Sequence, residues 1–263
     1  MAEVATFSFL QVASAWPTFD QTGDKYARGV VGVMTGSRRY PGAAVLSVLG
    51  ALNAGAGFVR YCGVDDARSA ILTRAPSVTF GPGRVGAWVA GCGWDDEDRS
   101  TSIAQWRQVC ADGVPVVIDA GALALAADGA PAGSLMTPHA GELARLMGVG
   151  RDEVESHPVD LVRQAARLFD TTVLLKGHTQ LVCAPGGQVT QLQEGSSWPA
   201  RAGSGDVLAG IAGTLLAQGV GPDMAGLLAA GIQAMVSLDH PGPYPPDRIA
   251  EFLPHHIGTG MAA

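Results

Sequence analysis

Short apolar runs alternate with helical stretches along most of the chain, and this alternation restricts the fold more than any other feature. The run Gly29–Thr35 (GVVGVMT) is apolar and β-branched, which is typical of a buried strand. A helical stretch follows over Ala43–Ala54, and a second strand is predicted at Phe58–Cys62. Strand, helix and strand in this order predict a parallel sheet, because parallel neighbours need a long crossover connection.

The same unit recurs towards the C-terminus. Further strands are predicted at Ala87–Ala90, Val114–Ile118, Ser134–Thr137, Thr172–Leu175, Gln180–Ala184 and Gln188–Leu192, with a hairpin turn at Gly186-Gly187 before the last. Further helices are predicted over Ser100–Ala111, up to Met147, over Asp160–Phe169, from Asp206 onwards and over Asp223–Leu238. We expect an irregular N-terminal segment over residues 1–28 and a Pro-rich C-terminal tail. Because no linker interrupts the pattern, the sequence predicts one α/β domain over residues 1–263, a mostly parallel central sheet with helices on both faces.

The composition argues against several classes of protein. Hydrophobic residues make up 47% of the chain and charged residues 16%, which indicates an ordered globule with a large core. The formal net charge of −7 argues against nucleic acid as a partner, because an extended phosphate-binding face needs clustered Lys and Arg. No apolar run is long enough to span a bilayer and no signal peptide is evident, so we expect a cytoplasmic protein with no membrane partner.

Cysteine and histidine spacing predicts no protein-bound metal. The four cysteines are scattered without a CxxC pair: Cys62, Cys92, Cys110 and Cys183. Reduced thiols are expected, and neither a zinc site nor a disulfide framework is indicated. His178 and the pair His255-His256 lack a third ligand at metal spacing, so we interpret them as surface or tail residues.

Polar or Gly-rich segments follow five of the predicted strands. They are Gly36-Ser37, Gly91-Cys92-Gly93, Asp119, His139–Glu142 and Lys176-Gly177. In open parallel sheets ligands bind outside the carboxyl ends of the strands. The sequence therefore predicts a functional site on this rim.

The stretch from Gly203 to Asp206 carries the most specific chemistry. Gly203, Ser204 and Gly205 form a turn of small residues, and Asp206 opens a long apolar helix. Glycines let the backbone approach a ligand closely, and exposed N–H groups at a helix start attract phosphate. A carboxylate there can take the proton from a hydroxyl that attacks a phosphoryl group. The alternative is that Asp206 simply caps the helix.

Taken together, these segments resemble a known family, the ADP/ATP-dependent NAD(P)H-hydrate dehydratases of the ribokinase-like fold. The resembling stretches are Gly36–Ala44 (GSRRYPGAA), Ala54–Gly57, Thr137–Glu142 (TPHAGE), Leu175–Gly177 and Gly203–Gly210. The GxGD turn is shared by many ribokinase-like enzymes. The TPHxGE stretch combined with the early GSxxYxGAA is much more specific.

The resemblance implies a lyase that repairs NAD(P)H whose nicotinamide ring has added water. ADP or ATP phosphorylates the ring hydroxyl, and the phosphate then leaves. Asp206 is the implied base, and Mg²⁺ is expected to neutralise the phosphates. The implied substrate-binding residues are Ala43, Gly93, His139 and Asp206. The implied nucleotide-binding residues are Lys176, Gly177, Gly203, Ser204 and Gly205.

Three polar residues on the rim each have two interpretations. His139 is favoured as a contact to the hydrated nicotinamide or its ribose. Glu142 is either a site residue or a first-turn residue favoured by the helix dipole. Lys176 either reaches nucleotide phosphate as a point charge or is a solvated lysine at a strand end.

Two positions depart from the family pattern. Gly121 stands where relatives commonly have a second Asp, and Arg201 stands where they have Thr. If both lie near one pocket, the local charge moves by about two units towards cation, which favours a more anionic ligand such as NADPH hydrate.

The resemblance also implies partners and leaves rivals open. A homo-oligomer, specifically a tetramer, is expected, with any epimerase for the hydrate on a separate chain. One rival function is a small-molecule kinase of the same fold, acting on a thiazole or sugar alcohol. Another is a nucleotide-binding protein that has lost catalysis.

Overall fold

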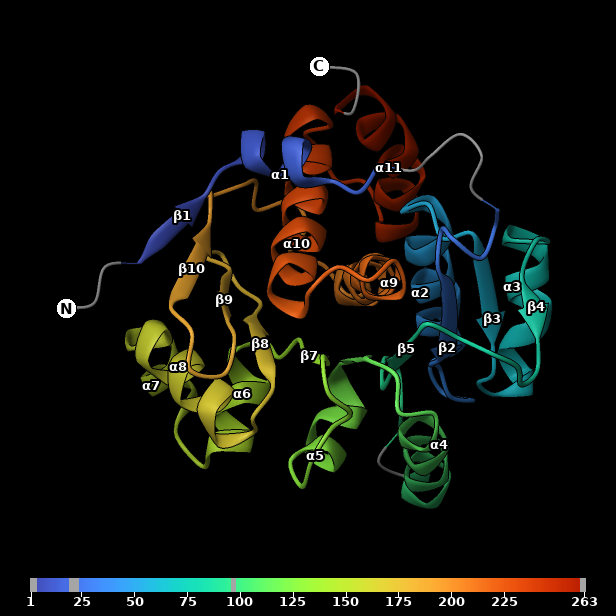
Figure 1. Ribbon diagram of the computed structural model, residues 1–263, viewed down its shortest axis with the longest axis horizontal. Helices are drawn as coiled ribbons and strands as arrows, with labels where there is room; N and C mark the ends of the chain where they lie inside the picture. Colours follow the sequence, from blue (N-terminus) through green and yellow to red (C-terminus); the bar gives the residue numbers. More distant parts are fainter. Residues whose placement is uncertain (1–3, 19–23, 96–97, 261–263) are drawn as a thin grey trace.

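A ten-stranded sheet forms the centre of the protein, seen here in a computed structural model that describes residues 4–18, 24–95 and 98–260 (Figure 1). The strands are β1 (Ala5–Phe7), β2 (Val30–Met34), β3 (Phe58–Tyr61), β4 (Thr79–Phe80), β5 (Ala87–Ala90), β6 (Val116–Ile118), β7 (Leu135–Met136), β8 (Thr172–Leu175), β9 (Leu181–Cys183) and β10 (Val189–Leu192). Their order is β1-β10-β9-β8-β7-β6-β5-β2-β3-β4. Neighbouring strands pair in parallel, except that β9 is antiparallel to both β8 and β10. The predicted mostly parallel sheet and the β9–β10 hairpin are confirmed.

Helices cover both faces of the sheet, as predicted. They are α1 (Phe9–Ala15), α2 (Pro41–Asn53), α3 (Arg68–Arg74), α4 (Arg99–Ala111), α5 (Leu123–Ala126), α6 (Ala140–Met147), α7 (Arg151–Ser156), α8 (Pro158–Leu168), α9 (Ser204–Ala217), α10 (Pro222–Asp239) and α11 (Pro246–Gly260). Figure 1 shows α4, α5, α6 and α8 on one side of the sheet and α9, α10 and α11 on the other. Strand β2 serves both cores, since Val31 and Val33 pack with the α9 side and Val30 and Met34 with the α4 side.

The direction of the sheet order reverses between β2 and β5. From β2 the chain adds β3 and β4 outwards on one side, and it then returns to place β5 against the opposite edge of β2. The loops that follow β2 and β5 therefore run apart from each other. Such a topological switch point leaves a crevice at the carboxyl ends of the strands.

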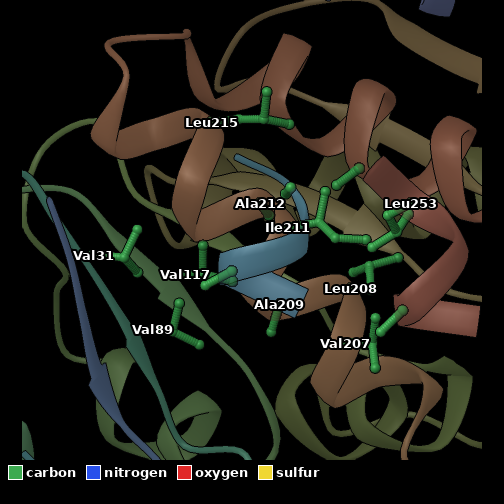
Figure 2. Close-up of a cluster of buried hydrophobic side chains, with 14 of the residues drawn as sticks. Val31, Val89, Val117, Val207, Leu208, Ala209, Ile211, Ala212, Leu215 and Leu253 are labelled. Atoms are coloured by element: carbon green, nitrogen blue, oxygen red, sulfur yellow. The ribbon is translucent and has the colours of Figure 1, made fainter. Parts of the chain in front are cut away.

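Helix α9 lies in the middle of one core and is buried on every side from Val207 to Leu216 (Figure 2). It crosses α2 very closely: a Cβ added at Gly210 would lie 2.2 Å from the carbonyl oxygen of Ser47, and one at Gly50 would lie 2.3 Å from that of Val207. Glycine on both helices permits this contact. The packing fixes the position of the α9 N-terminus over the sheet.

Both ends of the chain are more regular than the sequence analysis predicts. The N-terminal segment contains β1 and α1, and α1 begins at a capping box in which Ser8 and Gln11 satisfy each other's backbone N–H groups. The predicted Pro-rich tail is largely helix α11, with Pro254 inside it. His256 of α11 is buried, with its Nε2 atom 3.0 Å from Asp239 Oδ2, so its interpretation as a surface residue is wrong.

All four cysteines are free thiols, as predicted. Within the described ranges, none of the helices combines the length and the apolar character that a membrane span requires.

Candidate active site

A cavity of about 580 Å³ opens at the start of α9, and we call it the Asp206 cavity. Seven of the nine predicted site residues line it: His139, Lys176, Gly177, Gly203, Ser204, Gly205 and Asp206. They come from the segments after β7 and β8 and from the first turn of α9. Parallel strand topology thus brings the predicted residues to one place.

The Gly203–Gly205 turn leads into α9 in a conformation that favours glycine. Gly203 is the N-cap residue, and its φ of +95° lies in the left-handed region. No side chain caps the helix, so the alternative that Asp206 acts as the cap is not supported. Helix α10 fixes the turn, because Gln233 Nε2 donates a hydrogen bond to the carbonyl oxygen of Ser204 at 2.9 Å. The Ser204 N–H donates to the carbonyl oxygen of Arg201 at 3.2 Å, and the uncapped helix start leaves the N–H groups of Gly205 and Asp206 available to an anion.

A buried ion pair lies beside this turn. Lys176 Nζ is 2.5 Å from Asp119 Oδ1, and the same oxygen accepts a hydrogen bond from Thr137 Oγ1 at 2.9 Å. The two side chains are only 18% and 4% exposed, so the interpretation of Lys176 as a solvated strand-end lysine is wrong. Burial disfavours the ammonium charge, but the carboxylates of Asp119 and Glu142 raise the pKa of Lys176 above its ordinary value. Lys176 is therefore a fixed cation at the cavity wall.

The Asp206 carboxyl group has a strongly altered acidity. Burial, and secondarily the negative charge of Asp119, raise its pKa to about 7, against the opposing effects of Lys176 and Cys92. A general base works best when its pKa lies near the operating pH. The environment of Asp206 is therefore suited to proton removal at neutral pH.

Cys92 completes this cluster from the turn after β5. Its Sγ lies 3.6 Å from Asp119 Oδ2, and one ligand atom each of Cys92, Asp119 and Asp206 lie within 4.8 Å of one another. Burial, followed by the charges of the two carboxylates, raises the pKa of the Cys92 thiol, so it stays protonated. From the sequence, Cys92 and Asp119 are expected at strand ends and have no predicted role. Cys92 follows β5 and Asp119 follows β6, and the ends of two neighbouring parallel strands lie side by side. This adjacency is the signal that could have indicated their contact.

His139 and Glu142 form the capping box of α6. His139 Nδ1 accepts hydrogen bonds from the backbone N–H groups of Gly141 and Glu142, at 3.0 and 3.2 Å. Glu142 Oε2 accepts one from the backbone N–H of His139 at 2.8 Å. The first-turn interpretation of Glu142 therefore holds. His139 also lines the Asp206 cavity, and because Nδ1 accepts, a neutral ring presents Nε2–H as a donor.

Ala43 and Gly93 are the two predicted residues outside the lining of the Asp206 cavity. They touch each other instead: a Cβ added at Gly93 would lie 2.5 Å from Ala43 Cβ. Both lie beside the Cys92 turn, because Gly93 directly follows Cys92 and Ala43 contacts Gly93. Their predicted contact with substrate stays a prediction.

Comparison with known proteins identifies this arrangement. A family model described as NAD(P)H-hydrate dehydratase matches residues 31–254. The chain belongs to the NAD(P)H-hydrate dehydratase family. It is 42% identical over 231 residues to the bifunctional NAD(P)H-hydrate repair enzyme Nnr of Mycobacterium tuberculosis, which covers 83% of this chain and 47% of that protein. It is 34% identical to the ADP-dependent (S)-NAD(P)H-hydrate dehydratase of Neisseria meningitidis serogroup B, over 73% of this chain and 70% of that protein.

The solved structures agree on the fold of this NAD(P)H-hydrate dehydratase family member. An ADP/ATP-dependent NAD(P)H-hydrate dehydratase from Bacillus subtilis, co-crystallized with ATP/Mg²⁺, superposes with a TM-score of 0.90 at 23% identity over 99% of this chain and 100% of that one. The expected ribokinase-like fold is confirmed. The chain spans about half the length of the mycobacterial repair enzyme.

The two departures from the pattern of the NAD(P)H-hydrate dehydratase family line different cavities. Gly121 packs against Trp94, away from the Asp206 cavity, whereas Arg201 lines that cavity and donates a hydrogen bond to the carbonyl oxygen of Pro243 at 3.2 Å. The hypothesis that their charges compensate in one pocket is therefore not supported. His178, interpreted from sequence as an ordinary surface residue, is exposed but lines the Asp206 cavity.

Proposed function

We propose that this protein dehydrates the hydrates of NADH and NADPH, with ADP or ATP as the phosphoryl donor. The observation that carries the proposal is the Asp206 carboxyl group, with a pKa of about 7, beside the buried Lys176–Asp119 pair at the uncapped start of α9. Relatives named as ADP-dependent and ADP/ATP-dependent dehydratases support this choice of donor.

In the proposed first step, Asp206 accepts the proton of the ring hydroxyl while the hydroxyl oxygen attacks the terminal phosphorus of the nucleotide. The bond from that phosphorus to the bridging oxygen breaks, so AMP leaves from ADP, or ADP from ATP. The Gly203 and Gly205 amides and the Lys176 ammonium stabilise charge on the phosphoryl oxygens. Gly177 borders the same space and is proposed to contact the nucleotide.

In the second step the ring carbon–oxygen bond breaks and phosphate leaves with the electron pair. The neighbouring ring carbon loses a proton, which restores the double bond of NADH or NADPH. We propose that His139, through Nε2–H, and the Ala43 and Gly93 backbones hold the hydrated ring against Asp206 during both steps.

Asp119 and Asp206 also fit the oxygen chemistry of Mg²⁺. Magnesium is commonly held by one or two carboxylates together with substrate phosphates, whereas the neighbouring Cys92 thiol does not suit it. Oxygens of the two carboxylates lie within 4.8 Å of each other, so Asp119 would hold an ion that accompanies the nucleotide beside Asp206, which stays the base. Such an ion, when bound, neutralises phosphate charge. A homotetrameric assembly completes the proposal.

The decisive experiment is incubation with NADH hydrate, ADP and Mg²⁺, with ATP in a parallel reaction. Recovery of the dihydronicotinamide absorbance, with release of AMP and phosphate, is the expected result. A small-molecule kinase would instead transfer phosphate to a thiazole or sugar alcohol and recover no absorbance. A catalytically degenerate protein would show nucleotide-dependent stabilisation with no turnover of any of these acceptors.

A further inference from the structure

A second large cavity lies at the topological switch point of the sheet, and we call it the Arg38 cavity. Its volume is about 570 Å³. Its walls come from the segments after β2, β3 and β5 and from the start of α4, including Arg38, Asp66, Trp94 and Thr101. These loops diverge because the sheet order reverses between β2 and β5, and crevices of this kind are where open α/β sheets bind ligands.

One residue, Cys92, connects the lining of the Arg38 cavity to the surroundings of the Asp206 carboxylate. Gly36 lines the cavity, and its backbone N–H donates a hydrogen bond to the carbonyl oxygen of Cys92 at 2.7 Å. The Cys92 thiol in turn lies within 4.8 Å of an Asp206 carboxylate oxygen. Cys92 thus lies close to a lining residue of each cavity, Gly36 of the Arg38 cavity and Asp206 of the Asp206 cavity.

We infer that the Arg38 cavity binds the adenylate half of the dinucleotide substrate. The inference rests on the proposed function, which places the phosphoryl donor in the Asp206 cavity and the hydrated nicotinamide at Asp206. NADH hydrate is two nucleotides joined by a pyrophosphate, so its second nucleotide extends away from the donor. The Arg38 cavity is the space that the switch point provides in that direction.

The walls of the cavity have the chemistry that a nucleotide requires. Arg38 is exposed and makes no ion pair within the described part of the chain, so its guanidinium is available to the pyrophosphate. Trp94 is a fixed part of the wall, since its Nε1–H donates to the carbonyl oxygen of Met34 at 3.1 Å and only 8% of the residue is exposed. Asp66 and Asp98 on the other walls provide carboxylate oxygens, which accept hydrogen bonds from ribose hydroxyls.

The test compares two substrates that share the reacting ring: NADH hydrate and the hydrate of reduced nicotinamide mononucleotide, which lacks the adenylate half. We expect wild-type kcat/KM to favour the dinucleotide by at least about tenfold, the worth of one good charge-assisted contact. Arg38→Ala removes the cation from one wall. Gln105→Trp fills the cavity from α4 without changing its charge, because Gln105 is a half-buried lining residue.

Both variants are expected to lower kcat/KM for NADH hydrate about tenfold while the mononucleotide hydrate changes by less than about twofold. Arg107→Ala is the matched control, since Arg107 is an exposed α4 arginine outside the cavity lining, and the control should change neither value. Equal wild-type kcat/KM for the two hydrates, or equal losses on both substrates in the variants, would overturn the inference. If wild-type protein turns over neither hydrate with ADP or ATP, the proposed function fails as well.

Discussion

The two rim cavities have nearly the same volume but are built in different ways. The Asp206 cavity is walled by the buried Lys176–Asp119 ion pair and by the start of α9, a helix that is buried from Val207 to Leu216. The Arg38 cavity is walled by loops and the start of α4, and its arginines are exposed. Charges held in a buried, fixed arrangement stabilise a transition state without reorganisation, whereas exposed charges contribute modestly to binding. The difference indicates that chemistry belongs to the first cavity and recognition to the second.

The largest effect should come from removing the base of the Asp206 cavity. Asp206→Asn is expected to lower kcat about 10²–10⁴-fold, the usual loss of a general base. Nucleotide affinity should survive, so ADP at about a hundred times its Kd should still stabilise the variant by about 2.7 kcal/mol. Steady-state kinetics measures the loss in kcat, and thermal melts with and without ADP and Mg²⁺ measure the stabilisation by the nucleotide. A variant with near-normal kcat would show that the chemistry does not depend on this cavity.

Breaking the buried ion pair should cost stability where breaking an exposed pair does not. Lys176→Ala leaves the Asp119 carboxylate buried without its cation, and we expect a loss of about 3–5 kcal/mol in the free energy of unfolding. Arg151→Ala breaks the exposed pair with Glu155 and should cost less than about 1 kcal/mol. Urea denaturation compares the two. Equal losses would contradict the contrast between a buried and a solvated charge.

The pH dependence should report the raised pKa of Asp206. Because the base form is required, kcat/KM should rise about tenfold per pH unit below the pKa of about 7 and then level off. Stability should change in the opposite direction. The pKa of Asp206 in the folded state lies above the ordinary value of 3.8, so between these two values the folded state binds more protons than the unfolded state. The contribution of Asp206 to the free energy of unfolding should therefore fall as the pH rises from about 4 to about 7.

Asp119→Asn tests the cause of that pH dependence. It removes the neighbouring negative charge that helps to raise the pKa of Asp206, so the rising limb of kcat/KM should move to lower pH. A limb that stays in place would assign the whole shift to burial.

Restoring the family's acid at position 121 should harm the protein. A Cβ at Gly121 would lie 2.7 Å from Trp94 Cβ, so Gly121→Asp should destabilise by about 1–3 kcal/mol through overpacking. Since Trp94 also walls the Arg38 cavity, KM for NADH hydrate should rise while KM for ADP stays constant. A rise in the KM for ADP alone would contradict the separation of the two cavities.

The smallest effect is expected at the exposed edge of the Asp206 cavity. Arg201 is exposed and donates to the carbonyl oxygen of Pro243, so Arg201→Thr should change stability by no more than about 0.5 kcal/mol. Its effect on the preference between NADH and NADPH hydrate should be equally small. A large change in that preference, measured as the ratio of the two kcat/KM values, would revive the charge-compensation hypothesis.

The local units and the rim of the sheet follow from the order of residues along the chain. Each strand, its polar exit and the following helix are adjacent in the sequence, and parallel pairing necessarily places the exits at one edge. This is why sequence patterns suffice to place Lys176 and His139 on one rim, whereas the Gly203–Asp206 turn, which precedes a helix, joins them only through the family resemblance. Helix α1 is not predicted, because its seven residues are too few to show a helical apolar period.

The partners within that rim depend on how the strands are arranged in space. Asp119 and Lys176 are 57 residues apart, and their pairing depends on β7 lying between β6 and β8. The order of strands likewise creates the Arg38 cavity, since β5 could have joined either edge of the growing sheet. Burial and proximity set the acidity of Asp206, and both are properties of distance in space rather than of separation along the chain.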